Sequence, residues 1–305
     1  MELSQLEAFL AVVREGSFSA AAKALYRTQP AISQTIKRLE DEIGHPLFDR
    51  ASRRGLLTDA GRVLAVHAER LLNFRQQAMA ALDDVRQLKA GRLTIAANEL
   101  TCLYLLPLVH EFRRLYPDVH VTVQRALASR IPSQVLDFGA DMGVVTFQPD
   151  LGLLTSIVVY RDELAFVVPP SHAYARRSKV SIEELAGESF VAHHVSSPYR
   201  HKVIETFQDR RVTLLMPVEM PTIDAIKKFV AMGNGVALLP AISIEAELAR
   251  QELVRVRVPD LDFERKLRLV YRREATLSHA SQAFLAVVEA QAAVRKGRFS
   301  FAAEQ

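Results

Sequence analysis

A group of short or flexible polar side chains stands between residues 28 and 38, at a spacing that places them along one side of a helix. Such side chains can hydrogen-bond to base edges and phosphates when a helix lies in the major groove of DNA. We expect DNA contacts from Thr28, Gln29, Pro30, Ser33, Gln34, Lys37 and Arg38. The alternative is an amphipathic helix whose polar face is only solvated.

Residues 16–44 supply the two helices that would position these side chains. Apolar residues recur at helical spacing from Phe18 to Leu25, and again over residues 31–39. Only residues 26–28 separate the two runs, which predicts a tight turn and therefore a helix-turn-helix. A further amphipathic run over residues 3–13 would complete a three-helix core.

The segment 45–58 predicts a wing beside this pair of helices. Leu47 and Phe48 would hold the segment on the core, and Gly55 permits a turn between two short strands. Three arginines near the turn have guanidinium groups that could reach phosphates or a minor groove. They are Arg50, Arg53 and Arg54. The alternative is a basic loop that is only solvated. If the wing is present, we expect residues 1–58 to form a winged helix-turn-helix DNA-binding domain.

A long helical pattern with an apolar stripe follows over residues 59–90. Thr58 suits the N-cap, and Asp59 lies in the first turn, where the helix dipole favours a negative charge. The stripe has the heptad spacing of helices that pair, and it comprises Leu64, Leu71, Phe74, Ala78 and Val85. The N-terminal domain is too small to cover it, so we expect this linker helix to mediate dimerisation. Packing against the C-terminal part of the same chain is the alternative.

Residues 91–305 alternate between strand and helix patterns, which predicts an α/β fold with parallel strands. The expected strands are 92–97, 119–124, 142–145, 164–168, 190–193, 212–218, 236–240 and 267–271. The expected helices are 103–116, 131–138, 199–208, 222–232 and 278–295. We predict one lobe of about 91–160 with 266–305 and another of about 161–265, joined by two crossing strands with a cleft between the lobes.

Ligands in open α/β sheets bind beyond the carboxyl ends of strands, where helix N-termini present free amides. This rule selects residues 98–101, 128–130 and 146–147 in the first lobe, and 194–199 and 221–222 in the second. We expect effector contacts from Asn98, Glu99, Leu100, Thr101, Ser129, Thr146, Ser196, Ser197 and Thr222. Each hydroxyl alone is more often a helix cap, so the prediction depends on their convergence.

Composition excludes several classes of protein. The 305 residues are 49% hydrophobic and 24% charged, as in a globular protein of about two domains. No apolar run reaches the ~20 residues of a membrane-spanning helix, and the N-terminus lacks an export signal. Cys102 is the only cysteine, as expected of a cytoplasmic protein. The net charge of +4 is small, so the local clustering of basic residues matters more.

Motifs for catalysis and for metal binding are missing from the sequence. We find no nucleophile with a base at a suitable spacing, no phosphate-binding loop and no Cys/His ligand set. His193 and His194 are adjacent, and in a strand they would point to opposite faces and could not chelate together. We therefore expect no enzyme activity, no metal and no cofactor beyond a small-molecule effector of unknown identity.

The order and spacing of several motifs resemble those of the LysR-type transcriptional regulators. The motifs are Gly16-Ser-Phe-Ser-Ala-Ala-Ala, Gln29-Pro-Ala-Ile-Ser, Leu39-Glu-Asp-Glu-Ile-Gly44, Pro46-Leu-Phe-Asp-Arg50 and Leu57-Thr-Asp-Ala-Gly61. The resemblance implies a double-stranded DNA operator, a linker helix that pairs antiparallel with its twin, and an effector domain with the fold of periplasmic binding proteins. It also implies a dimer or a dimer of dimers, and contact with RNA polymerase.

The sequence departs from this family at one point of the predicted effector site. The family commonly carries Ser or Thr where Leu100 stands, and Glu99 adjoins it. A carboxylate at this place would repel an anion unless it meets Arg130 or Arg200. An effector that bears an amine, such as a zwitterion, would instead be attracted.

These features together predict a homo-oligomeric transcription factor that binds specific operators under the control of a small molecule held between two lobes. Two alternatives stay open. One is a DNA-binding regulator whose cleft no longer binds a ligand. The other is a solute-binding receptor, which the C-terminal lobes alone would allow.

Overall fold

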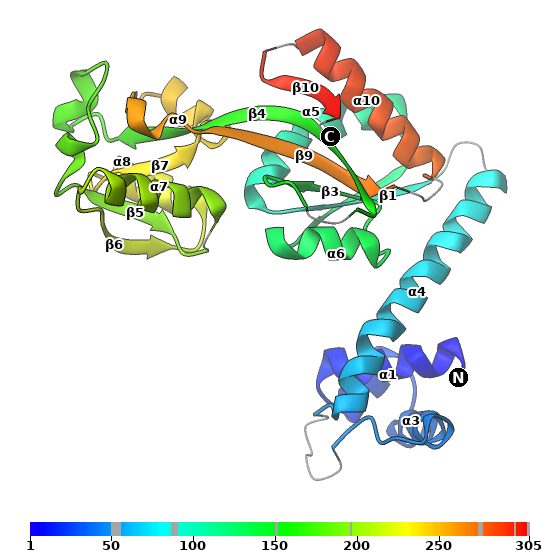
Figure 1. Ribbon diagram of the computed structural model, residues 1–305. Helices are drawn as coiled ribbons and strands as arrows, with labels where there is room; N and C mark the ends of the chain where they lie inside the picture. Colours follow the sequence, from blue (N-terminus) through cyan, green and yellow to red (C-terminus); the bar gives the residue numbers. More distant parts are fainter. Residues whose placement is uncertain are drawn as a thin grey trace. The chain divides into compact units, whose positions relative to one another are not determined.

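A computed structural model of the chain shows two compact units (Figure 1). One unit is Met1–Leu88 with Asp137–Gly139, and the other is Lys89–Leu136 with Ala140–Gln305. The structure describes residues 1–49, 56–86, 91–149, 152–195, 197–273, 277–295 and 297–303. We treat each unit by itself.

Three helices form the core of the first unit. They are α1 (Leu3–Glu15), α2 (Phe18–Ala24) and α3 (Gln29–Ile43). Ser17 Oγ accepts a hydrogen bond from the N–H of Ala20 at 3.1 Å and so caps α2. Gly16 (φ +68°) follows α1 and Gly44 (φ +77°) follows α3, in a left-handed conformation that favours glycine. The predicted helix-turn-helix is confirmed.

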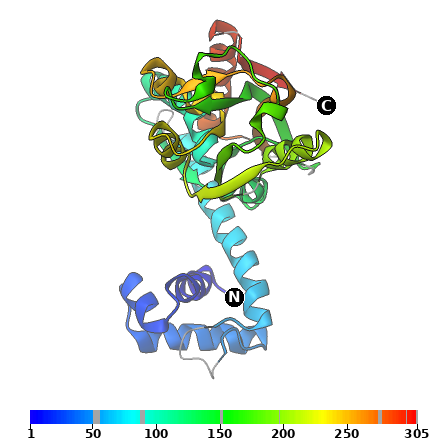
Figure 2. The ribbon, with the colours of Figure 1, turned by 90° about the vertical axis from the view of Figure 1, so that its left-hand side faces the viewer.

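Two short antiparallel segments lead from α3 into a long helix. Phe48 and Leu57 form an antiparallel bridge between them. Thr58 Oγ1 accepts a hydrogen bond from the N–H of Gly61 at 3.0 Å, which confirms the predicted cap of α4 (Asp59–Arg86). Beyond its first turns, α4 leaves the three-helix core as a single rod (Figures 1 and 2). The predicted turn at Gly55 lies outside the described residues.

The first lobe of the second unit is a mixed sheet covered by helices on both faces. Its strands, in spatial order, are β10 (Phe299–Ala303), β4 (Leu154–Val168), β9 (Glu264–Arg272), β3 (Met142–Val145), β1 (Arg92–Ala97) and β2 (His120–Arg125). The pairs β1–β2 and β1–β3 are parallel, as predicted. Ile95 faces α5 (Glu99–Leu115) and α10 (His279–Arg295), whereas its neighbour Ala96 faces α6 (Ile131–Leu136).

The second lobe is built on the continuation of β4. Its other strands are β5 (Ser189–His193), β6 (Leu215–Met220), β7 (Ala237–Pro240) and β8 (Val254–Val256). Its helices are α7 (Pro198–Asp209), α8 (Ile223–Ala231) and α9 (Glu245–Ala249). Short 3-10 turns lie at Ala128–Arg130, Ala173–Arg176, Glu183–Leu185, Ala241–Ser243 and Pro259–Leu261. The strands β4 and β9 pass from one lobe to the other side by side (Figure 1), so the predicted pair of crossing strands is confirmed.

Several boundaries differ from the sequence prediction for local reasons. The strand expected at 164–168 is the end of β4, which is continuous from Leu154 because it pairs with β9, β10, β7 and β8 in turn. Helix α5 begins at Glu99 rather than at residue 103, because Asn98 and Thr101 form a capping box. The strands β8 and β10 were not predicted. Both are short and gain their partners from distant parts of the chain.

Candidate functional site

The exposed side of α3 carries the side chains predicted to read DNA. Ile32, Ile36 and Leu39 are buried in the helical core and fix the opposite side. The seven predicted contacts are exposed, and they are Thr28, Gln29, Pro30, Ser33, Gln34, Lys37 and Arg38. Among the described residues, their side chains have no hydrogen-bond or ion-pair partner. Their donors and acceptors are therefore available to a nucleic acid.

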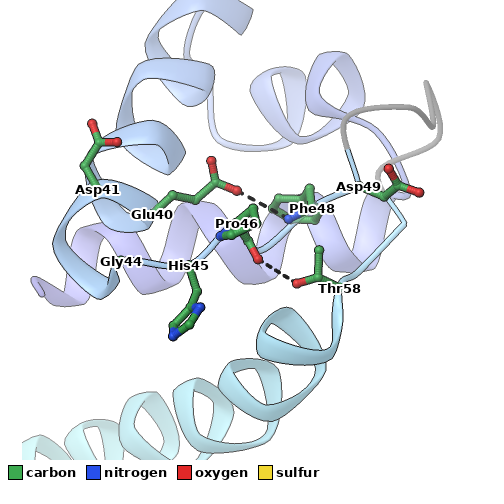
Figure 3. A pocket seen from close by; sticks show the side chains of 8 residues that line it. All are labelled: Glu40, Asp41, Gly44, His45, Pro46, Phe48, Asp49 and Thr58. Atoms are coloured by element: carbon green, nitrogen blue, oxygen red, sulfur yellow. Dashed lines mark hydrogen bonds between the residues drawn. The ribbon is translucent and has the colours of Figure 1, made fainter.

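The end of α3 is tied to the first segment of the wing (Figure 3). Glu40 Oε1 accepts hydrogen bonds from the N–H groups of Leu47 at 2.7 Å and Phe48 at 3.3 Å. Thr58 Oγ1 donates to the carbonyl of Pro46 at 2.7 Å. These bonds fix the wing segment relative to the reading helix. Arg50, Arg53 and Arg54 lie outside the described residues, so their contacts stay predictions.

The same residues border an acidic hollow, which has no metal-binding arrangement. Figure 3 shows the carboxylate of Glu40 turned toward Phe48, with the carboxylates of Asp41 and Asp49 lying apart from it on opposite sides. No group of three His, Cys, Asp or Glu side chains in the described parts of the chain could hold a metal ion.

Leu64, a residue of the predicted dimerisation stripe, faces the core of its own chain rather than solvent. Leu64 is partly buried and packs on the helical core of its own chain, because the first turns of α4 lie against that core. Further along, Leu71, Phe74 and Ala78 are exposed. Val63 and Val66 are exposed too and extend this apolar face toward the start of α4. The side chain of Val85 lies outside the described residues.

A cavity of about 560 Å³ lies between the two lobes of the second unit. It is bordered by the start of α5, the segment after β2 and the segment after β3, as the strand-end rule predicted. The second lobe contributes the end of β5 and the start of α7. Six of the predicted effector contacts line the cavity, and they are Asn98, Glu99, Leu100, Ser129, Thr146 and Ser197.

Two of the predicted effector contacts, Thr101 and Thr222, are not among the residues that line the cavity. Thr101 is fully buried, and its Oγ1 accepts a hydrogen bond from the N–H of Asn98 at 3.0 Å within the capping box of α5. Thr222 Oγ1 accepts a hydrogen bond from the N–H of Ala225 at 3.2 Å and caps α8. Neither lines the cavity. Ser196 lies outside the described residues.

The first turn of α5 joins the two lobes. Glu99 Oε1 accepts a hydrogen bond from the N–H of Ile223, the first residue of α8, at 3.1 Å. Its other oxygen lies 4.0 Å from Nε2 of His193. Leu100 packs against the apolar core of the second lobe. The carboxylate thus occupies a helix N-terminus, where an anion is favoured.

His193 borders this junction. Its pKa lies below the ordinary value, chiefly because burial disfavours the charged form; the charge of His194 acts in the same direction, and Glu99 opposes both. The rings of the two histidines stack at a centroid distance of 5.1 Å, so the expectation that they point to opposite faces is wrong. Strand β5 ends at His193, and the alternation of strand side chains ends with it.

Two arginines of the cavity wall are matched by carboxylates, Arg200 by one from its own lobe and Arg265 by one from the crossing strand β4. Arg200 forms an ion pair with Glu219 and donates to the carbonyl of His193 at 2.8 Å. Arg265 Nη1 lies 2.8 Å from Oδ2 of Asp162. Burial raises the pKa of Asp162 and lowers the pKa of Arg265, and their mutual attraction opposes both shifts.

The predicted contacts include Ser197 of the second lobe, and the selected segment 194–199 contains Tyr199, which also lines the cavity. The predicted contacts do not include His193, Arg200 and Arg265, which line it as well. Arg265 stands directly opposite Asp162 in the register of β9 and β4, where two opposite charges in paired strands form a buried ion pair, but this register is known only from the tertiary fold.

Two family models match the chain. The model described as "Bacterial regulatory helix-turn-helix protein, lysR family" matches residues 3–62, and the one described as "LysR substrate binding domain" matches residues 86–293. The chain belongs to the LysR family. It is a DNA-binding transcriptional regulator with an effector-binding domain, and this is a family of regulators rather than of enzymes.

Relatives and solved structures agree with this assignment. A "Probable RuBisCO transcriptional regulator" of Cyanidioschyzon merolae is 36% identical over 272 residues, which are 87% of this chain and 90% of that protein. The fold resembles that of full-length CbnR complexed with its target DNA, with a TM-score of 0.74 at 19% identity over 95% of this chain and 99% of that one. It also resembles the regulatory domain of Synechocystis PCC6803 CcmR in complex with 2-PG (TM-score 0.60, 24% identity, 65% and 96% coverage).

No helix in the described ranges of this LysR-family chain is long and apolar enough to cross a membrane.

Proposed function

We propose that this regulator acts in the cytoplasm on an operator of RuBisCO genes and responds to a small molecule in the cavity between its lobes. The observation that carries the proposal is the relative with 36% identity over 87% of the chain, whose name gives that target. The match extends over 272 residues, which is too long for the DNA-binding domain alone and must include most of the effector-binding domain.

DNA reading is assigned to the exposed side of α3. Gln29, Ser33 and Gln34 are short donors and acceptors suited to base edges, whereas Lys37 and Arg38 suit phosphates. Pro30 at the start of α3 and the uncapped hydroxyl of Thr28 lie at the end of the helix that would enter the groove. The wing arginines Arg50, Arg53 and Arg54 would add phosphate or minor-groove contacts.

Self-association is assigned to the exposed apolar face of α4. Leu71, Phe74 and Ala78 remain from the predicted stripe, and Val63 and Val66 extend it. Exposed apolar side chains along one helix face favour pairing with a second copy, and a dimer or dimer of dimers would place two reading helices on one operator. Contact with RNA polymerase would then follow from the position of the bound oligomer.

The cavity is assigned to the effector. Asn98, Ser129, Thr146 and Ser197 offer polar groups from both lobes, so a ligand in the cavity would touch both. Glu99 is engaged by the N–H of Ile223, and we therefore assign it to holding the lobes together rather than to binding an amine. A ligand can change operator binding only through different affinities for two arrangements of the protein.

The proposal is tested with the purified full chain and a labelled DNA fragment from upstream of the RuBisCO genes of the same genome. Fluorescence anisotropy should show tighter binding to this fragment than to a shuffled fragment. The logarithm of the binding constant should fall linearly with the logarithm of the salt concentration, because binding to phosphates releases counterions. Equal binding to both fragments would refute operator specificity. Deletion of the gene should change RuBisCO transcript levels, and unchanged levels would refute the proposed target.

A further inference from the structure

Three arginines line the cavity between the lobes, and they differ in what holds them. Arg200 forms an ion pair with Glu219. Arg265 Nη1 lies 2.8 Å from Oδ2 of Asp162. Arg125, the last residue of β2, is exposed and has no hydrogen bond or ion pair from its side chain among the described residues. It is therefore the one guanidinium of the described wall whose charge is not balanced by a neighbouring carboxylate.

Two hydroxyls lie at the same edge of the first lobe as Arg125. Ser129 follows β2 and Thr146 directly follows β3, and both line the cavity. Neither hydroxyl has a hydrogen-bond partner in the part of the chain that the structure describes. Only β1 separates β2 from β3 in the sheet, and neighbouring strands are about 4.8 Å apart, so the two strand ends are about 10 Å from each other. The first lobe thus offers the cavity a positive charge and hydroxyl donors, which are groups that bind a carboxylate or phosphate.

The second lobe presents an apolar wall to the same cavity. Four side chains at the edge of its core line the cavity and are only partly buried, and they are Leu164, Leu214, Met216 and Leu238. An apolar part of a ligand that covers them removes this surface from water, which is favourable. The cavity of about 560 Å³ has the size of a pocket for a small metabolite, so one molecule can reach both walls.

Glu99 is the acidic side chain of the described wall, and its charge is already accommodated. Its Oε1 accepts a hydrogen bond from the N–H of Ile223 at the start of α8, where the helix dipole favours a negative charge. Its other oxygen lies 4.0 Å from Nε2 of His193. Within the described ranges no ion pair joins Glu99 to Arg125, so the charge of Arg125 is available to a ligand.

We propose that the effector is an amphipathic anion, in which one carboxylate or phosphate group binds Arg125 in the first lobe and an apolar body covers the wall of the second. This inference rests on the proposed function of the cavity as the effector site. The anionic group also accepts hydrogen bonds from Ser129 and Thr146. Because the two ends of the ligand meet different lobes, both make contact only in one arrangement of the lobes. The ligand therefore binds that arrangement more tightly, as a change in operator binding requires.

The ligand class is tested on the full chain with probes of similar shape. Phenylacetate and benzyl phosphate carry an anionic group on an apolar ring, whereas phenethyl alcohol is neutral and phenethylamine is cationic. Acetate, inorganic phosphate and ribose 5-phosphate carry negative charge without the apolar body. At millimolar concentration phenylacetate or benzyl phosphate should raise the Tm more than every other probe, and the better of the two identifies the anionic group. An equal rise with phenethyl alcohol or phenethylamine, an equal rise with a probe that lacks the ring, or no rise with any probe would overturn the class.

The role of Arg125 is tested with Arg125→Gln, which removes the charge of an exposed side chain. Binding of phenylacetate or benzyl phosphate, whichever raises the Tm more, should weaken by about tenfold or more in isothermal titration calorimetry, because a charge-assisted contact is lost. Arg125→Lys keeps the charge and should lose less affinity. Arg130→Gln is the matched control, since Arg130 is an exposed arginine of the same segment and does not line the cavity, and it should bind the probe like the wild type. Equal affinities of Arg125→Gln and Arg130→Gln would overturn the assignment.

The salt dependence of binding separates contact with the anion from a merely structural role of Arg125. The affinity of the wild-type chain for the anionic probe should fall as sodium chloride is added, because salt screens the exposed charge of Arg125. The affinity of Arg125→Gln should depend less on salt, and the same dependence in both proteins would overturn the contact. A wild-type chain that binds the probe but not the RuBisCO fragment would refute the proposed target and support the ligand class.

Discussion

Replacement of Gly61 by alanine should destabilise the DNA-binding domain, although the same change normally strengthens a helix. Gly61 is the third residue of α4. A Cβ atom there would lie 2.1 Å from the carbonyl oxygen of Leu47 and 2.9 Å from a methyl group of Leu57. The carbonyl cannot easily retreat, because it accepts a hydrogen bond from the N–H of Thr58 at 3.0 Å. The N–H of Leu47 is in turn held by Glu40 at 2.7 Å.

The magnitude follows from two opposing effects. Glycine to alanine in an unobstructed helix stabilises by up to about 1 kcal/mol. Overpacking against a fixed neighbour costs about 1–3 kcal/mol and occasionally more, and here the obstacle is backbone rather than a flexible side chain. With the cost at the upper end of that range, about 3 kcal/mol, the net result should be a loss of about 2 kcal/mol, which for a small domain lowers the Tm by roughly 8–16 °C.

Thermal unfolding of the full chain, followed by circular dichroism, measures this effect, and fluorescence anisotropy on operator DNA measures its consequence for the wing. Gly152→Ala is the matched control, because a Cβ at Gly152 meets no atom within 4 Å. The control should retain both the Tm and the DNA affinity. A Tm of Gly61→Ala at or above that of the wild type would show that the wing is not packed on α4 as described.

Three further substitutions test operator recognition, self-association of the chain and thermal stability at acid pH. Ser33→Ala should reduce discrimination between operator and mutated operator by about 1–3 kcal/mol, measured by competition anisotropy. Phe74→Glu should shift the chain toward monomer in analytical ultracentrifugation, because it puts a charge on the exposed apolar face of α4. The hydrogen bond from Arg255 holds the pKa of Glu163 below its ordinary value of 4.5, so its stabilisation is present above that value and is lost as the pH falls through the lowered pKa. When Tm is measured against pH, Glu163→Gln should therefore reduce the fall of Tm at acid pH.

Each of the three changes has its own control. Thr35→Ala removes a hydroxyl that already donates to the carbonyl of Ala31 at 2.9 Å, and it should leave operator discrimination unchanged. Gln76→Glu adds the same charge on the other side of α4 and should leave the association state unchanged. Glu205→Gln alters an exposed carboxylate and should leave the fall of Tm at acid pH unchanged. If a control behaves like its partner variant, the corresponding assignment is wrong.

The arrangement of strands and helices could be predicted where the pattern is local. The helices α2 and α3 follow from apolar spacing, and the buried strands β1 and β3 follow from short apolar runs bounded by polar residues. The full length of β4 could not be predicted, because its first half is defined by pairing with β9 more than a hundred residues away. The edge strand β10 depends on β4 in the same way.

The site was predictable only in part, for a related reason. The strand-end rule found the segments that border the cavity in the first lobe, since it depends on topology. It could not separate Ser129, which lines the cavity, from Thr101, whose hydroxyl caps α5. Both are small hydroxyl residues after a strand, and only the direction of the side chain distinguishes them. Arg265 was missed because β9 returns to the cavity from far along the chain.

The contacts between the lobes limit how a ligand can act. Glu99 bonds to the start of α8, and the hydroxyl of Tyr199 donates to the carbonyl of Thr146 at 3.4 Å, so each lobe holds the other at the mouth of the cavity. A ligand that merely fills the space leaves these contacts equal in both arrangements and shifts nothing. A ligand therefore acts only where it binds one arrangement of these contacts between the lobes more tightly than the other.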